Sequence, residues 1–109
     1  MKATVYSNEL IIGEVNLQMV DENMGCISGN FIPTINYYDF IQETVWEFWE
    51  TPKPNYQKWY ALNFQVKLSN GHILKPEGGY SINDLKELPN EPITIDIMGL
   101  PSDIIILFK

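Results

Sequence analysis

The sequence predicts an α+β domain: a mostly antiparallel sheet of about six or seven short strands, with one long helix packed on one face. Three observations carry this prediction. Polar and apolar residues alternate in several short stretches, Asn70-Gly71 separates two of them, and one central segment has the apolar spacing of a helix. The length of 109 residues and the apolar share of 45% fit a single domain, residues 1–109, with one core.

Three strands are expected before residue 33. Residues 3–6 form the first, and the alternation of apolar and polar side chains along residues 15–19 indicates the second. Residues 26–32 form the third. Gly29 lies inside this third strand, and a glycine there often marks a bulge or the close approach of another backbone.

The helix is expected over residues 35–50, with Thr34 as its N-cap and Pro52 just beyond its end. At 100° per residue its apolar side chains gather on one arc that is wide enough to lie across a sheet. The arc consists of Ile35, Tyr38, Val45, Trp46 and Trp49, with Tyr37, Ile41 and Phe48 beside it.

Strands resume after the helix. Residues 62–69 and 72–74 flank Asn70-Gly71, which predicts a two-residue hairpin turn with positive φ at both turn positions. Residues 81–88 suit a short helical turn, and residues 93–97 suit a further strand. The apolar residues 104–108 suit a buried strand, with a helical turn as the open alternative.

The charge balance narrows the choice of partners. Fourteen acidic residues oppose seven lysines, giving a net charge of −7, and the chain has no arginine. Such a chain is repelled by nucleic acid and by anionic membranes, and it attracts cationic partners.

The longest apolar run is far shorter than the roughly 20 residues of a membrane span. With no signal peptide evident and a lone cysteine, Cys26, we expect a cytoplasmic location.

The chain has few residues suited to metal binding, phosphate binding or catalysis. One histidine and one cysteine cannot form the usual zinc site, and Gly78-Gly79 lacks the Lys-Ser/Thr of a phosphate loop. Ser81 has no nucleophile elbow around it, and Glu43 and Glu47 lie on one exposed helical face. We therefore expect no enzymatic activity, no cofactor and no metal.

Aromatic residues concentrate around the helix, since eleven of the fourteen lie between Phe31 and Phe64. We expect most of them to fill the core, because each buries roughly 150–250 Å². The remainder would form a partly exposed patch, for which Trp46, Trp49, Trp59 and Tyr60 are the candidates. Phe40 projects away from the apolar arc and is expected to be exposed.

The polar side of the helix is uniformly acidic. Asp39, Glu43, Glu47 and Glu50 fall within a band of about 80° at the standard helical angle, and no lysine occurs from residue 35 to 50. Exposed helices usually mix charges of both signs. The band therefore serves either for solubility or, together with Phe40, as a docking surface for a cationic partner.

Three functional hypotheses follow. The first is a non-catalytic protein-binding domain that neutralises a basic partner. In size, acidity and lack of catalytic groups the chain resembles the immunity proteins that inhibit bacterial toxins, and this resemblance implies a basic toxin as the partner. The second is a small-ligand module in which the aromatic patch stacks on carbohydrate. The third is a subunit of a larger assembly.

Overall fold

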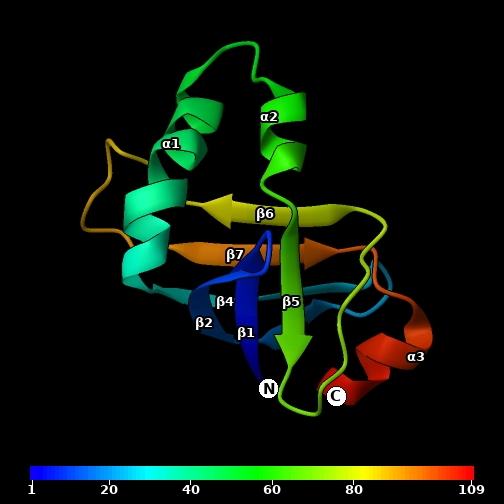
Figure 1. Cartoon of the computed structure of the whole chain (residues 1–109). Helices are drawn as coiled ribbons and strands as arrows, with labels where there is room; N and C mark the ends of the chain where they lie inside the picture. The colour runs from blue at the N-terminus through cyan, green and yellow to red at the C-terminus, as the bar shows by residue number, and fades with distance from the viewer.

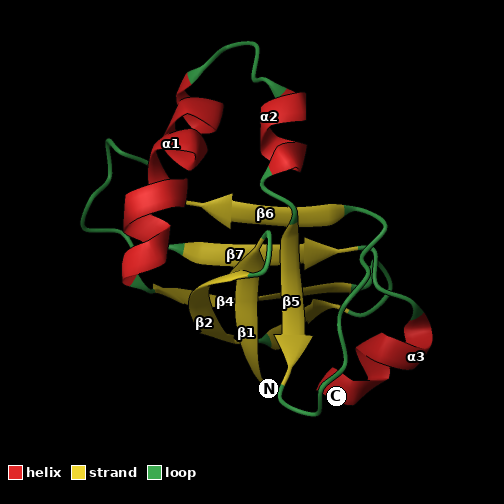
Figure 2. Cartoon of the chain, viewed as in Figure 1, coloured by secondary structure: helices red, strands yellow, loops and turns green.

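The computed structural model describes residues 1–109, and it shows a curled antiparallel sheet with a 14-residue helix packed against it (Figures 1 and 2). The predicted α+β class is confirmed. The elements in chain order are β1 (Lys2–Ser7), β2 (Leu10–Asn16), β3 (Gln18–Asp21), β4 (Cys26–Pro33), the π-helix η1 (Tyr37–Ile41), α1 (Gln42–Glu50), α2 (Tyr56–Ala61), β5 (Phe64–Leu68), β6 (Gly79–Asn83), β7 (Thr94–Met98), α3 (Ser102–Ile105) and the 3₁₀-helix η2 (Ile106–Phe108).

Neighbouring strands follow the order β5-β1-β2-β4-β7-β6, and β3 also pairs with β4. β2 and β3 run one after the other along the same side of β4. The expected single strand over residues 15–19 breaks at Leu17, whose backbone N–H bonds to the carbonyl oxygen of Met1 at 2.8 Å. At this break the backbone of Asn16 lies where a Cβ on Gly29 would be. The close approach expected at Gly29 is therefore confirmed.

The core fills the inside of the curl. Val5 and Val66 from β1 and β5 and Ile82 and Ile95 from β6 and β7 have no exposed surface. These strands come from the two ends of the sheet, so the curl closes one apolar interior between them (Figure 1). No helix of the fold is long and apolar enough to cross a membrane.

The two-residue hairpin of the fold joins β1 to β2, and it is not the hairpin expected at Asn70-Gly71. Asn8 and Glu9, with φ of 48° and 73°, make the two-residue turn that joins β1 to β2. Around residue 70, the N–H of Leu68 bonds to the carbonyl of His72 across a three-residue loop, and positive φ occurs only at Gly71. The prediction of positive φ at both turn positions is therefore wrong. Residues 72–74 form only an isolated bridge to β5.

The segment 35–50 is helical as expected, but its first part is a π-helix. The N–H of Gln42 bonds to the carbonyl of Tyr37, five residues back, so the helix turns less per residue there than the assumed 100°. As a result the buried residues are Tyr37, Ile41 and Val45, whereas Ile35 and Tyr38 of the expected arc are exposed.

The cap of this helix also differs from the expected one. Thr34 does not cap it, because its hydroxyl donates to the carbonyl of Ile11 at 3.1 Å. That bond ties the start of the helix to β2 instead.

A second helix, α2, was not expected. Asn55 caps it by accepting a bond from the N–H of Lys58 at 3.1 Å, and Asn63 ends it with a positive φ of 47°. Asn8 of the first hairpin donates to the carbonyl of Ala61 at 2.9 Å. The hairpin therefore supports the end of α2 and fixes where β5 begins.

The structure also decides two expectations for the second half of the chain, of which the first is wrong and the second resolves to its open alternative. The short helical turn expected over residues 81–88 is instead strand β6 and the loop after it: Ile82 faces the core, while Ser81 and Asn83 bond to each other on the other face. Residues 104–108 are helical, the alternative that the sequence left open, because the chain turns at Pro101 and buries Ile105 alone.

One buried carboxylate ties the long helix to the sheet. Asp84, directly after β6, is 8% exposed and has no lysine or histidine partner. Three neutral donors from the helix converge on it: the Tyr37 hydroxyl at 2.6 Å, the Gln42 amide at 3.1 Å and the Trp46 indole N–H at 3.0 Å. The position of the helix therefore depends on the side chain of Asp84, which lies more than 30 residues further along the chain. Burial and hydrogen bonds join the two.

Replacing Asp84 with alanine should destabilise the domain strongly. Asp84→Ala leaves three donors without an acceptor in a site of low water access. We expect the free energy of unfolding to fall by about 2–4 kcal/mol, measured by urea denaturation. Asp84→Asn keeps the shape and one acceptor oxygen and should lose less. Equal stability of all three proteins would show that these hydrogen bonds do not anchor the helix.

Stability should also fall at alkaline pH through Tyr37. Burial, with the hydrogen bond to Asp84 and its charge, holds the pKa of Tyr37 far above the usual tyrosine value. Above about pH 10 the unfolded chain releases this proton while the folded chain keeps it, so the free energy of unfolding falls by about 1.4 kcal/mol per pH unit. Unfolding curves recorded across this range should decline less steeply for Tyr37→Phe. Parallel declines would contradict the assignment.

Candidate functional site

Five exposed side chains occupy the outer side of the long helix. All of the residues expected there are exposed, and the prediction for Phe40 is confirmed at 66% exposure. We call this surface the acidic face; it consists of Asp39, Phe40, Glu43, Glu47 and Glu50. Asp39 and Phe40 come from η1 and the three glutamates from α1.

The domain's own lysines neutralise little of the acidic face. Lys58 of α2 pairs with Glu47 at 3.0 Å, and both side chains remain about half exposed. Asp39, Glu43 and Glu50 have no lysine or histidine within 4.0 Å. Three of the four carboxylates therefore present their charge to solvent.

The expectation that most aromatic residues around the helix fill the core is wrong. Among the aromatic residues of the helices only Tyr37 and Trp59 are buried, whereas Tyr38, Phe40, Trp49, Tyr56 and Tyr60 are exposed. The reason lies in the position of α1 and α2, which extend past β6 at the upper edge of the sheet in Figure 1 instead of lying flat across it. Their facing sides therefore pack on each other beyond the sheet.

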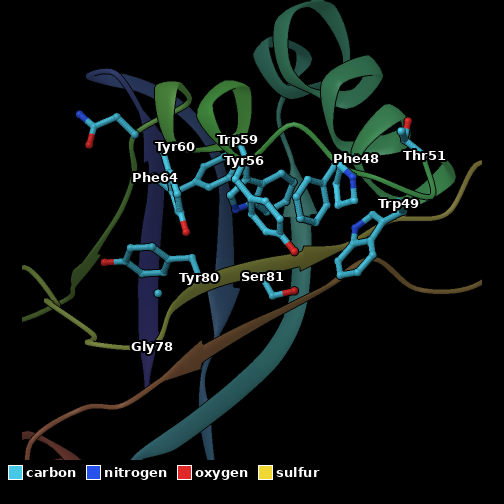
Figure 3. A pocket seen from close by; sticks show the side chains of 13 residues that line it. Phe48, Trp49, Thr51, Tyr56, Trp59, Tyr60, Phe64, Gly78, Tyr80 and Ser81 are labelled. Carbon is cyan, nitrogen blue, oxygen red and sulfur yellow. The ribbon is translucent and has the colours of Figure 1, made fainter.

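These overhanging side chains enclose a groove of about 560 Å³ between α1, α2 and β6 (Figure 3). We call it the aromatic groove. Polar atoms reach it from Thr51, Asn63 and Ser81, and no charged residue lines it. Its aromatic lining consists of Phe48, Trp49, Tyr56, Trp59, Tyr60, Phe64 and Tyr80.

The rings of the groove contact one another mainly edge to face. Trp59 lies in the middle, with its centroid 5.4 Å from that of Phe64 and 6.4 Å from that of Trp49, at steep interplanar angles. The indole N–H of Trp49 donates to the carbonyl of Ile82 in β6 at 2.8 Å. The ring faces thus pack against the edges of neighbouring rings and do not form one flat platform.

The four residues of the expected aromatic patch do not form one surface. Trp49, Trp59 and Tyr60 meet in the aromatic groove. Trp46 is not among its lining residues, because its indole bonds to Asp84 and the ammonium of Lys86 lies 5.6 Å from its ring centroid. The structure therefore brings together three of the four.

Sequence reasoning missed two contributions to the groove: Tyr56 of α2, and strand β6 with Tyr80. Tyr56, Trp59 and Tyr60 are spaced by three and four residues, which is a helical signal that the proline-rich segment before them obscured. Tyr80 belongs to the strand taken for a helical turn. Its hydroxyl donates to the carbonyl of Leu74 at 2.8 Å, and burial raises the pKa of Tyr80.

The two surfaces are suited to non-covalent binding. The acidic face offers carboxylates in water, and the groove offers apolar rings with a few hydrogen-bonding groups. No group of three or more His, Cys, Asp or Glu side chains is arranged so that it could hold a metal ion. No protein-family model, no curated protein and no solved structure matches this chain, so the interpretation of both surfaces depends on their own geometry.

Proposed function

We propose that this domain binds a basic protein partner and acts without catalysis. The observation that carries the proposal is the acidic face: three unpaired carboxylates and an exposed phenylalanine on one helical segment, in a chain of net charge −7 without arginine. Such a surface costs the isolated domain some stability, because like charges on one helix side repel by about 0.2–0.5 kcal/mol per pair.

Two kinds of interaction contribute to the proposed binding: long-range attraction between charges and a close apolar contact. The carboxylates steer a cationic partner toward the helix, which raises the association rate at low ionic strength. Phe40 then supplies a desolvated contact, since exposed aromatic side chains are frequent anchors of protein interfaces. Asp84 holds this helix in place against the sheet.

More specifically, we propose that the domain is an inhibitor that neutralises a basic bacterial toxin. A toxin that cleaves nucleic acid needs a cationic substrate surface, and an acidic domain that covers this surface would block it. The support is the net charge and the one-sided charge of the helix.

Carbohydrate binding is the second candidate, and the aromatic groove favours it. Tyr56 and Tyr60 are exposed at its rim, with ring centroids 6.3 Å apart. The edge-to-face packing of the deeper rings leaves less open ring surface than a sugar platform needs. Partner binding by the acidic face therefore remains the primary proposal.

Charge reversal tests the primary proposal. We expect Glu43→Lys with Glu50→Lys to lower the affinity for a basic protein captured from the native host by at least about tenfold at low salt. Both sites are exposed and unpaired, so the melting temperature should stay nearly unchanged. The matched control is Glu14→Lys with Glu91→Lys, which changes the net charge equally at exposed sites outside the acidic face.

Affinity is measured by calorimetry over a series of salt concentrations. For the wild-type domain, binding should weaken as salt rises, because screening reduces the attraction between the charges. Equal affinity of the charge-reversed protein and the control would remove the acidic face from the interface.

A further inference from the structure

β6 is the last strand at one end of the sheet, and only β7 pairs with it. The direction of its backbone groups follows from the ladder. Phe31 of β4 donates to Ile93, and Ile95 and Ile97 lie two and four residues further along β7, so these residues direct their backbone groups toward β4. Thr94 and Asp96 therefore bond to β6.

The same alternation determines which backbone groups of β6 point away from β7, toward the free edge of the sheet. Asp96 pairs with Ser81 and Thr94 pairs with Asn83, so the backbone groups of Tyr80 and Ile82 point to the free edge. The carbonyl of Ile82 confirms this direction, since it accepts the indole N–H of Trp49. The N–H and the carbonyl of Tyr80 and the N–H of Ile82 have no partner within the fold.

This free edge lies along the aromatic groove. Gly79, Tyr80 and Ser81 of β6 line the groove, and rings from α1 and α2 form its opposite wall (Figure 3). Proteins usually cover or charge an exposed strand edge to prevent pairing with other chains. Here no charged side chain lines the groove, and the two helices border the edge with the aromatic groove between them and β6.

We infer that an extended, cationic polypeptide segment binds in the aromatic groove by adding a strand to the free edge of β6. Its backbone would pair with the N–H and carbonyl of Tyr80 and with the N–H of Ile82, since the carbonyl of Ile82 already accepts from Trp49. Its alternate side chains would pack on Trp49 and Tyr80. The cationic character rests on the proposed function. α1 contributes Phe48 and Trp49 to the groove and Glu50 to the acidic face, so the two surfaces adjoin on one helix.

An extended segment explains the unpaired groups better than two other occupants. The hydroxyl groups of a sugar do not reproduce the paired N–H and carbonyl groups of an adjoining strand, and the rings of the groove are packed mainly edge to face. A second copy of this domain would bring its own α1 and α2 against the same helices, because both extend past β6 in Figure 1. A single extended chain avoids this collision.

Selection from a displayed library of short random peptides tests the inference with a defined probe. We expect the enriched peptides to carry lysine or arginine and to slow the exchange of the Tyr80 and Ile82 amide hydrogens of the wild-type domain by at least about tenfold. Peptides N-methylated at alternate backbone amides should lose binding, because they cannot complete the ladder.

A matched pair of variants isolates the backbone contribution. Tyr80→Ala and Tyr80→Pro both remove the side chain, but only proline removes the N–H at the free edge. Because this N–H does not bond to β7, both variants should fold. The enriched peptides should bind Tyr80→Pro at least about tenfold more weakly than Tyr80→Ala. The exchange measurement on the wild-type domain decides the question if either variant fails to fold.

Several results would overturn the inference. They are the absence of enriched peptides, unprotected Tyr80 and Ile82 amides, binding of cellohexaose in the groove in place of peptide, and a wild-type dimer that already protects these amides. Peptides that protect both amides but bind the Glu43→Lys, Glu50→Lys protein equally well would support strand addition and overturn the cationic partner. A basic partner that needs the acidic face but leaves the amides unprotected would overturn strand addition alone.

Discussion

The fold depends on one buried carboxylate that accepts hydrogen bonds from the long helix. Asp84 follows the edge strand β6, and its oxygens receive donors from η1 and α1 while the indole of Trp49 bonds to Ile82 in the same strand. A carboxylate among neutral donors is stable only when its hydrogen bonds are complete. The position of the helix at the edge of the sheet is therefore fixed by polar contacts as well as by apolar burial.

That position produces both candidate surfaces. Because α1 is held at β6 and extends past it, one side of the helix faces water with its carboxylates and another side meets α2 beyond the sheet. The groove exists because Phe48 and Trp49 overhang the strand edge instead of packing flat on the sheet. The same geometry leaves the backbone of Tyr80 without a partner, so charge, aromatic surface and a free strand edge occur together on one part of the molecule.

The sequence predicted those features that are set by local periodicity. The fold class, the helical segment over residues 35–50 and the strands at residues 3–6, 26–32 and 93–97 all follow from period and turn residues. The exposure of Phe40 was predicted for the same reason. Features set by tertiary contacts were missed. The π-turn at Tyr37 rotated the buried side of the helix, and Asp84 fell within the short helical turn expected over residues 81–88, although its partners lie on α1 and η1.

Exchange of the indole N–H protons of Trp46 and Trp49 tests the anchoring of the helix most directly. The structure predicts that both protons exchange slowly, because one is bonded to the Asp84 carboxylate and the other to the Ile82 carbonyl. Asp84→Ala should accelerate the exchange at Trp46. Exchange of both protons in the wild-type protein at the rate of an unprotected indole would contradict the anchoring, and with it the shared origin of the acidic face and the groove.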